Sequence, residues 1–290
     1  MTVVADNRRG ILLMCLTTFV FAMQDGFSRH LAETYNTYLV VMIRYWFFAA
    51  FVVALAMRQQ GGLARVVRSR FPVLQTVRGA LLALEICVTV LSFTLLGLTE
   101  THAVFICFPL MIAALSGPVL GEQVGWRRWA SIGVGALGVM IILQPGTGVF
   151  SPVAAIPLLG ALMFAVYGLM TRYVSRGDSS ATSLFYTGTV GCLVMTAIGV
   201  FYWEPMTSRD WLWMGMLCVS GVFGHWLLIK TYEAAEASAV QPFAYLQLPF
   251  AAALGMVVFG ETLRANVAIG ASVVVGAGLF TWWREQRKRP

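Results

Sequence analysis

Long apolar runs separated by short polar connections occupy almost the whole chain. Because about 20 consecutive apolar residues are enough to cross a bilayer, each run is predicted to form a membrane-spanning helix. The longest connection, from about Arg58 to Pro72, leaves no room for a soluble domain. The predicted fold is therefore an all-α integral membrane protein with ten transmembrane helices. Their expected spans are 10–30, 36–57, 73–97, 102–120, 128–145, 152–173, 180–203, 210–231, 237–259 and 264–283.

One helical hairpin occurs twice in this pattern, at residues 89–122 and 225–261. Each copy contains an apolar run, a turn with glutamate, a second apolar run interrupted by prolines, and a Gly-Glu pair at its end. The turn holds Glu100 in the first copy and Glu233 and Glu236 in the second. The prolines expected to break or hinge the helices are Pro109, Pro118, Pro242 and Pro249.

Fixed offsets between the two halves extend this repeat to the whole chain. The paired residues include Arg29 with Arg172 (offset 143), Glu100 with Glu236 (offset 136), and Gly121-Glu122 with Gly260-Glu261 (offset 139). Each half, residues 1–145 and 146–290, then has five spans, and an odd number of spans inverts the second half in the membrane. Inverted repeats are typical of transporters that open alternately to either side. We therefore expect two inverted five-helix repeats around a central cavity.

These features resemble the EamA group of the drug/metabolite transporter (DMT) superfamily. The resemblance covers the whole chain and is carried by residues 103–122 and 239–261 and by the glycine-rich spans that follow them. Those glycines are Gly133, Gly135, Gly138, Gly270, Gly276 and Gly278. Pro249 matches the midway proline of the family pattern, whereas Pro109 comes early. The resemblance implies a multi-pass protein of the bacterial inner membrane that exports or exchanges small metabolites, as in the branch that exports aromatic amino acids.

Composition agrees with a membrane protein, since 59% of the residues are hydrophobic and 11% are charged, against about 25% charged residues in soluble domains. The net charge of +7 does not indicate a nucleic-acid partner, because the basic residues lie in short connections and at the termini. With a cytoplasmic N-terminus nearly all of them, Arg78 included, fall on the cytoplasmic side, as the positive-inside rule requires. Only Arg29, Arg209 and Arg264 fall outside, so both termini are expected in the cytoplasm.

The sequence offers little for other kinds of chemistry. The five cysteines all lie in apolar runs without a CxxC pair, so we expect small buried residues and no disulfide framework or metal site. The three histidines form no HExxH motif, and there is no GxSxG sequence. No enzyme activity, cofactor or metal is expected. The expected partners are a small-molecule substrate and the lipid bilayer, for a monomer or a homodimer.

Polar residues inside the apolar runs are the candidate site, because a charge within a bilayer costs at least about 2.5–3.5 kcal/mol and needs a partner or a purpose. Asp25, Arg44, Glu85 and His225 lie within the expected first, second, third and eighth spans. Thr89 follows Glu85 by four residues and shares its helix face. The predicted cavity residues are Gln24, Asp25, Glu85, Thr89, Phe108, Tyr167, His225, Trp226, Tyr245 and Gln247.

Several of these residues have a structural interpretation beside the functional one. Pro249 is expected to leave the Tyr245 carbonyl without its helical donor, free to accept from a substrate ammonium group. Glu85 and Arg44 could form a structural ion pair, or Glu85 could bind substrate or a proton. His225 could be a packing residue rather than a proton carrier. Gln24 and Gln247 could link helices by hydrogen bonds rather than bind a ligand. The four aromatic residues of the predicted cavity could pack the helices rather than form a substrate cage.

Residues near the span ends have mainly structural interpretations. Glu122 and Glu261 are expected to cap helices or mark the membrane interface rather than take part in transport. The glycines of the fifth and tenth spans are expected to let helices approach closely, within a monomer or across a dimer.

The predicted function is a secondary transporter that exports or exchanges small metabolites by alternating access. Amino acids, aromatic or neutral, are the expected substrates, because carboxylates and carbonyls suit an ammonium group and aromatic residues suit a side chain. The export direction follows only from the resemblance. Nucleobases and sugar-like, cationic or drug-like metabolites remain the alternative. If transport is coupled to protons, Glu85 is the expected proton carrier.

Overall fold

A computed structural model describes residues 7–58, 62–121, 126–143, 152–235, 240 and 243–286. Every regular element in these ranges is helical, which confirms the all-α prediction. The α-helices are α1 (Asn7–Ala32), α2 (Thr37–Arg58), α3 (Gly62–Val67), α4 (Pro72–Phe105), α5 (Phe108–Leu120), α6 (Trp126–Leu143), α7 (Ala155–Val174), α8 (Ser180–Gly199), α9 (Ser208–Ala234), α11 (Gln247–Phe259) and α12 (Ala265–Gln286). Short 3-10 helices, η1 (Pro152–Ala154) and η2 (Val200–Tyr202), precede α7 and follow α8.

Six of the described helices, α1, α2, α4, α7, α8 and α9, are long and apolar enough to cross a membrane. The other expected spans fall on α5, α6, α11 and α12, whose apolar stretches are 10–17 residues long. A span usually needs about 17–25 residues unless its ends are buried in protein. The crossing of these shorter helices, and with it the ten-helix arrangement, therefore stays a prediction.

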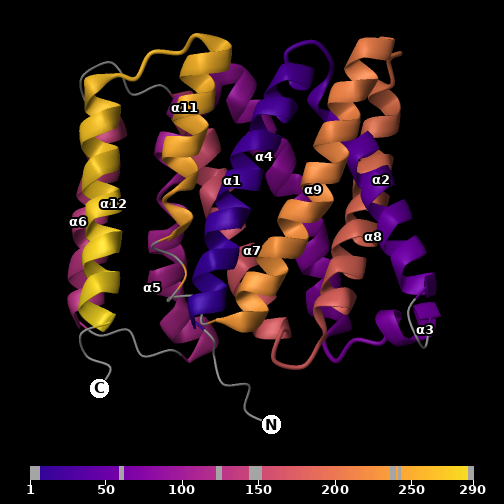
Figure 1. Cartoon of the computed structure of the whole chain (residues 1–290), viewed down its shortest axis with the longest axis horizontal. Helices are drawn as coiled ribbons and strands as arrows, with labels where there is room; N and C mark the ends of the chain where they lie inside the picture. Colours follow the sequence, from indigo (N-terminus) through magenta and orange to yellow (C-terminus); the bar gives the residue numbers. More distant parts are fainter. Residues whose placement is uncertain are drawn as a thin grey trace.

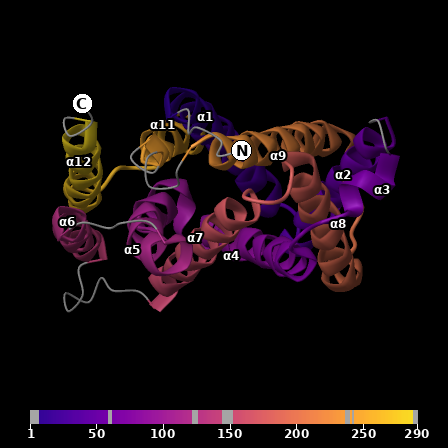
Figure 2. The same ribbon diagram turned by 90° about the horizontal axis from the view of Figure 1, so that it is seen from below.

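The helices stand side by side in an elongated bundle (Figure 1). α6 and α12 pair at one end, α2, α3 and α8 lie at the other, and α1, α4, α7 and α9 lie between them (Figures 1 and 2). α1 packs along α9, and α4 packs along α7 and α8, so the middle of the bundle joins early and late parts of the chain. α1 begins and α12 ends on the same side of the bundle (Figure 1).

A break at Gly97 divides α4 into two helical segments. Gly97 has φ 79° and ψ 173°, a positive-φ backbone that glycine adopts at low cost. This break coincides with the expected end of the third span at residue 97, but the expected turn at Glu100 is wrong. The helix resumes at Leu98, and Glu100 lies in its first turn, where its carboxylate pairs with Arg264 at 3.1 Å. The glycine, not the helix-favouring glutamate, supplies the break.

The Glu261 carboxylate caps the segment that follows this break. Glu261 lies between α11 and α12 and accepts hydrogen bonds from the backbone N–H groups of Leu98 and Thr99, both at 2.8 Å. The Thr99 hydroxyl and Arg29 Nη1 also donate to it. Burial raises the pKa of Glu261, but the hydrogen bonds from Thr99 and Leu98 and the charge of Arg29 outweigh burial, so its pKa lies below the usual range. The predicted capping role of Glu261 is confirmed; Glu122 lies outside the described residues.

Helices α5 and α11 correspond to each other in the two halves. Each begins after a two-residue turn, at residues 106–107 and 245–246, and each ends at a left-handed glycine, Gly121 (φ 72°) and Gly260 (φ 66°). Each feature of α5 recurs in α11 at the offset of 139 residues found in the sequence. The other expected break positions in these hairpins are Pro118, which lies inside α5, and Pro242, which lies outside the described residues.

The remaining prolines lie in the first turns of these two helices. Pro109 is the second residue of α5 and Pro249 is the third of α11, where a backbone N–H would have no helical acceptor. The prediction that Pro249 leaves the Tyr245 carbonyl free is wrong, because this carbonyl accepts a hydrogen bond from the Leu248 N–H at 3.2 Å. The turn that precedes α11 supplies this donor, which the position of a proline alone does not indicate.

Arg78, which falls within the third expected span and is counted with the cytoplasmic basic residues, is buried inside the bundle. Arg78 lies on α4, and its side chain is 0% exposed. All of its guanidinium N–H donors have acceptors, which are Gln75 Oε1, Tyr167 Oη, Thr171 Oγ1, the Ser183 carbonyl and Thr187 Oγ1. The polar side chains of α7 and α8 converge on one point of α4. The order of residues along the chain does not indicate that these side chains meet. Arg78 therefore ties three helices together.

Glycines bring α6 and α12 into backbone contact. A Cβ atom at Gly138 would lie 2.7 Å from the Gly270 carbonyl oxygen, and one at Gly270 would lie 2.5 Å from the Gly138 carbonyl oxygen. Both distances are shorter than a real Cβ contact, so only glycine fits at either position. The predicted close approach of the glycine-rich spans is confirmed, and it occurs within one chain.

The Glu261 cap predicts a pH-dependent stability. Because the pKa of Glu261 is lower in the folded protein, its contribution is fully present above the unfolded value, about 4.3, and is lost as the pH falls through the folded value. We expect Glu261→Gln to lower the stability at pH 7 by about 1–3 kcal/mol and to reduce the loss of stability below about pH 5. Thermal unfolding of the purified protein in detergent, measured across pH, checks this.

A matched control removes a carboxylate that does not cap a helix. Within the described residues Glu233 pairs with Lys230, at 2.7 Å, and its side chain is 37% exposed, so Glu233→Gln is expected to cost less than about 1 kcal/mol. Identical pH profiles for the wild type and Glu261→Gln would contradict the role given to the cap.

Candidate functional site

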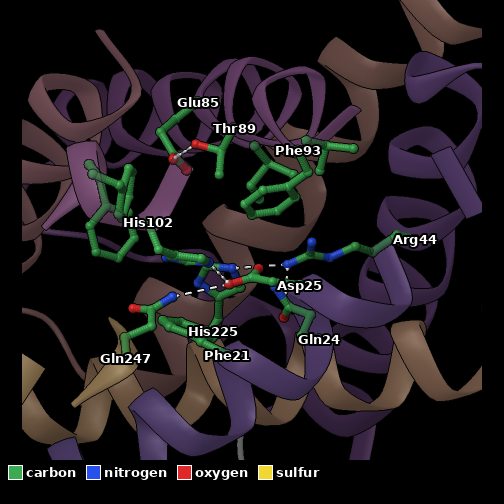
Figure 3. Close-up of a pocket in the computed structure, with 14 residues that line it drawn as sticks. Phe21, Gln24, Asp25, Arg44, Glu85, Thr89, Phe93, His102, His225 and Gln247 are labelled. Carbon is green, nitrogen blue, oxygen red and sulfur yellow. Dashed lines mark hydrogen bonds and ion pairs between the residues drawn. The ribbon is translucent and has the colours of Figure 1, made fainter. Parts of the chain in front are cut away.

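An internal cavity of about 40 Å³ lies where α1, α2, α4, α7, α9 and α11 meet (Figure 3). Its lining residues are Phe21, Gln24, Asp25, Arg44, Glu85, Ile86, Thr89, Val90, Phe93, His102, Phe105, Phe164, His225 and Gln247. The predicted cavity residues among them are Gln24, Asp25, Glu85, Thr89, His225 and Gln247. The volume suits a few water molecules, whereas typical small-molecule sites have about 300–1,000 Å³. This conformation is therefore closed to an organic metabolite.

Asp25 joins three helices on one side of the cavity. Its Oδ2 accepts a hydrogen bond from Gln247 Nε2 of α11 at 3.1 Å. His102 Nε2 of α4 lies 3.1 Å from the same oxygen, but this N–H is not aligned for a hydrogen bond, so the contact is electrostatic proximity rather than a formed bond. Figure 3 shows the side chains of Gln247 and His102 converging on the Asp25 carboxylate.

Arg44 forms a second polar cluster on the other side, and its partner is not Glu85. Nη2 of Arg44 donates to Gln24 Oε1 and contacts His225 Nε2, both at 3.2 Å. Because a guanidinium group can only donate, His225 Nε2 accepts and its proton lies on Nδ1. The structure contains no ion pair between Arg44 and Glu85, although both line the cavity. α2 directs the guanidinium toward α1 and α9, which explains why the predicted pair does not form.

Glu85 stands apart from both clusters. It is 3% exposed and accepts a hydrogen bond from Thr89 Oγ1 at 2.6 Å. The spacing of four residues on α4 brings the two side chains together, as the sequence predicts. No cation lies at ion-pair distance from this carboxylate within the described part of the chain. Glu85 is thus a buried carboxylate with a single neutral donor, facing the cavity beside the two charged clusters (Figure 3).

The predicted aromatic residues do not line the cavity in this conformation. Phe108 and Tyr167 lie behind lining residues, with ring centroids 5.0 Å and 6.0 Å from the ring of Phe164. Tyr245 is buried, at 3% exposure, but lines no part of the cavity. Trp226 is 39% exposed on the outer surface of α9. Adjacent helical residues point about 100° apart, so His225 faces inward and Trp226 outward.

Two aromatic rings and a histidine that the sequence analysis did not predict line the cavity instead. Phe93, His102 and Phe105 all lie on α4, on both sides of the break at Gly97. The rings of Phe93 and His102 lie 5.4 Å apart because the chain changes direction between them. The glycine was visible in the sequence, but the direction of the segment after it was not.

The described residues do not form a metal site. No group of three or more His, Cys, Asp or Glu side chains in these ranges could hold a metal ion. The cysteines Cys15, Cys87, Cys107, Cys192 and Cys218 are all free. Cys87, Cys107 and Cys218 are buried, as expected from their positions in apolar runs, whereas Cys15 and Cys192 are only partly buried.

Comparisons with known proteins relate the chain to a family of transporters. The model of the EamA-like transporter family matches residues 8–144 and 152–283. The chain is 26% identical over 278 residues to the S-adenosylmethionine uptake transporter of Rickettsia prowazekii, covering 96% of this chain and 94% of that one. It is 31% identical over 193 residues to the riboflavin transporter of Vibrio cholerae, covering 64% and 63% of the two chains.

A further riboflavin transporter and a solved structure extend this picture. The riboflavin transporter of Rhizobium johnstonii is 29% identical over 244 residues, covering 82% of this chain and 79% of that one. A solved crystal structure matches with a TM-score of 0.66 and 17% identity, covering 98% of this chain and 97% of the other. At that identity the likeness concerns the fold alone.

The Asp25 cluster predicts a stability effect that depends on what replaces the carboxylate. Asp25→Ala leaves Gln247 Nε2 without its acceptor in a buried site and removes the carboxylate beside His102, and is expected to destabilise the protein by about 1–3 kcal/mol. Asp25→Asn keeps an oxygen for Gln247 and is expected to cost less. Thermal unfolding in detergent compares the two variants with Glu33→Ala, which changes a side chain on the segment after α1 that is 44% exposed. Equal losses for Asp25→Ala and Glu33→Ala would contradict this assignment.

Proposed function

Because the chain belongs to the EamA-like transporter family of the DMT superfamily, we propose that it moves small metabolites across the membrane through the closed cavity. The observation that carries this proposal is the convergence of Asp25, Arg44 and Glu85 on one internal space. Ionisable residues inside membrane helices usually mark a substrate or ion pathway, because burying them without a purpose is costly. The protein carries substrate rather than transforming it chemically.

The proposed mechanism is alternating access of two inverted five-helix repeats, residues 1–145 and 146–290. The cavity is lined from both halves, by α1, α2 and α4 from the first and by α7, α9 and α11 from the second. The matching bounds and glycine ends of α5 and α11 support the repeat. The breaks that precede these helices, next to Pro109 and Pro249, are the proposed hinges, together with Pro118 and Pro242.

The proposed topology has ten membrane crossings with both termini in the cytoplasm of a bacterial cell. α5, α6, α11 and α12 supply the four crossings beyond the six long apolar helices. The start of α1 and the end of α12 lie on the same side of the bundle, as an even number of crossings requires (Figure 1). The excess of basic residues on that side remains without Arg78.

The proposed substrates are amino acids or metabolites that contain an amino-acid group. The Asp25 and Glu85 carboxylates suit an ammonium group, and the rings of Phe21, Phe105 and Phe164 suit an apolar or aromatic part. The similarity to S-adenosylmethionine transporters favours this class, because that metabolite carries an amino-acid group. The similarity to riboflavin transporters favours a second class, uncharged or weakly charged ring systems. Export, expected from the resemblance, has no support in the relatives' names, one set of which refers to uptake.

Counterflow in proteoliposomes tests this proposal without assuming a direction. The panel contains labelled amino acids, S-adenosylmethionine and riboflavin. We expect label to accumulate only when the same unlabelled compound is inside the vesicles. The Gln247→Ala variant is expected to take up label at an initial rate at least about tenfold lower, because Gln247 donates a hydrogen bond to Asp25 at the cavity wall. Trp226→Leu, a change on the outer surface of α9, is the control and should transport like the wild type. Folded protein that accumulates no member of the panel would overturn the proposal for these substrate classes.

Proton coupling, if present, is assigned to Glu85. The charged or titratable groups that face the same cavity are Asp25 of α1, Arg44 of α2, His102 of α4 and His225 of α9. Glu85→Gln cannot take up a proton, so we expect transport by this variant to lose the pH dependence of the wild type. The pH dependence is measured as the initial counterflow rate between pH 5.5 and 8.5, a range of about three units around neutrality. Glu33→Gln is the control. An active Glu85→Gln variant with the wild-type pH profile would remove Glu85 from this role.

A further inference from the structure

Two arginines are almost completely buried in the described part of the bundle, and they differ in how their donors are used. Arg78 is 0% exposed, and each of its five N–H donors has an acceptor on the protein. Arg44 is 2% exposed, and both of its hydrogen bonds come from Nη2. Buried polar groups are normally satisfied, so Arg78 fits a purely structural role and Arg44 does not.

The open donors of Arg44 are Nε–H and the two N–H groups of Nη1. Nε is buried and has no hydrogen-bond partner. Asp25 and Glu85 line the same cavity, but neither forms an ion pair with the guanidinium. A buried guanidinium without a carboxylate in direct contact is costly unless a ligand completes its hydrogen bonds.

A second buried donor lies beside it. His225 is 2% exposed, and its Nε2 is occupied as the acceptor for Arg44 Nη2. The proton therefore lies on Nδ1, which is buried and has no partner. The Arg44 cluster thus has unused donors on two residues. A ligand that completes it must bring acceptors.

The backbone of α9 makes room for the guanidinium. A Cβ atom at Gly221 would lie 2.8 Å from Arg44 Nε and 3.3 Å from Cζ. The guanidinium therefore rests against the bare backbone of Gly221, and a larger residue at this position would displace it. This contact fixes Arg44 at the cavity wall and offers a way to move it without removing its charge.

We propose that Arg44 is an anion subsite of the cavity that binds the carboxylate of a zwitterionic substrate. The proposal rests on the proposed function, since it takes the cavity to be the substrate site. The planar fork of a guanidinium matches the two oxygens of a carboxylate, and the small volume of the cavity favours this group over a phosphate. Gln247 approaches from the side opposite Arg44, and the Asp25 carboxylate lies between the two (Figure 3). The substrate ammonium is therefore placed at this carboxylate, which holds the molecule in one orientation.

Formate binding tests the subsite without requiring a known substrate. Formate is the smallest carboxylate and suits a cavity of about 40 Å³. The unfolding temperature of the purified protein in detergent is measured against sodium formate, at constant ionic strength kept with sodium isethionate, whose anion is too bulky for the cavity. We expect a saturable rise of a few degrees for the wild type, and no rise with formamide, a neutral compound of similar size. A wild type without a saturable response to formate would overturn the proposal.

Variants of Arg44 test whether this residue causes the rise of the unfolding temperature with formate. Arg44→Gln is expected to weaken formate binding at least about tenfold, the loss of one charge-assisted interaction, and Arg44→Lys to weaken it less. Arg58→Gln, which removes an exposed arginine from the end of the same helix, should respond like the wild type. If Arg44→Gln does not fold, Gly221→Ala replaces it and is expected to weaken binding by displacing the guanidinium. Wild-type affinity for formate in Arg44→Gln, or in Gly221→Ala where that variant replaces it, would overturn the assignment.

Transport then separates this inference from the proposed function. For a compound that shows counterflow, the analogue with an amide in place of the carboxylate is expected to be transported at least about tenfold less well by the wild type, and Arg44→Lys to discriminate less between the two. Counterflow with no such discrimination would overturn the subsite and leave the transporter intact. Formate binding without counterflow for any compound would overturn the proposed transport function and leave the anion subsite intact.

Discussion

The Glu261 carboxylate holds the break in α4 at Gly97, and the geometry of the cavity depends on that contact. Without it the amide groups of Leu98 and Thr99 would lose their acceptors at the start of a buried helical segment, which is costly in an apolar environment. Arg29 binds the same carboxylate and lies over the ring of Phe259, 4.1 Å from its centroid. The contact therefore joins α1, α4 and α11 at one end of the bundle.

The direction of the α4 segment after Gly97 has consequences in the cavity. It turns His102 and Phe105 back toward Glu85, Thr89 and Phe93 of the preceding segment, so one broken helix supplies much of the lining. Irregular backbone of this kind is tolerated at membrane depth where protein groups satisfy it or where it faces a cavity. Both conditions hold at Gly97, because the cap satisfies the amides and the segment leads to the cavity wall.

The closed state is small enough to exclude a metabolite, so binding requires the helices around the cavity to separate. Their polar contacts are of unequal strength. Arg78 links α4, α7 and α8 with every donor satisfied, and this group of helices would resist separation. The contacts between helices at the cavity wall, from Asp25 to Gln247 and from Arg44 to Gln24 and His225, are single bonds of 3.1–3.2 Å. A ligand that offers better partners can replace these bonds one by one.

Sequence by itself determined the helical membrane class, the end of a helical segment at residue 97, a structural rather than transport role for Glu261, and six of the ten residues predicted to line the cavity. The physical reason is that a charge or an amide inside an apolar run is costly enough to be informative without any knowledge of its neighbours. Glycines were informative in the same way, at a break and at the contact between Gly138 and Gly270.

Tertiary structure decided which of these groups meet. Arg44 binds Gln24 and His225 and not Glu85, Arg78 is buried among acceptors from α7 and α8, and Trp226 faces outward although its neighbour His225 faces the cavity. Each outcome depends on the rotation of one helix about its axis and on its axial position relative to the neighbouring helix. Those quantities are set by the packing of whole helix faces, and no local stretch of sequence contains them.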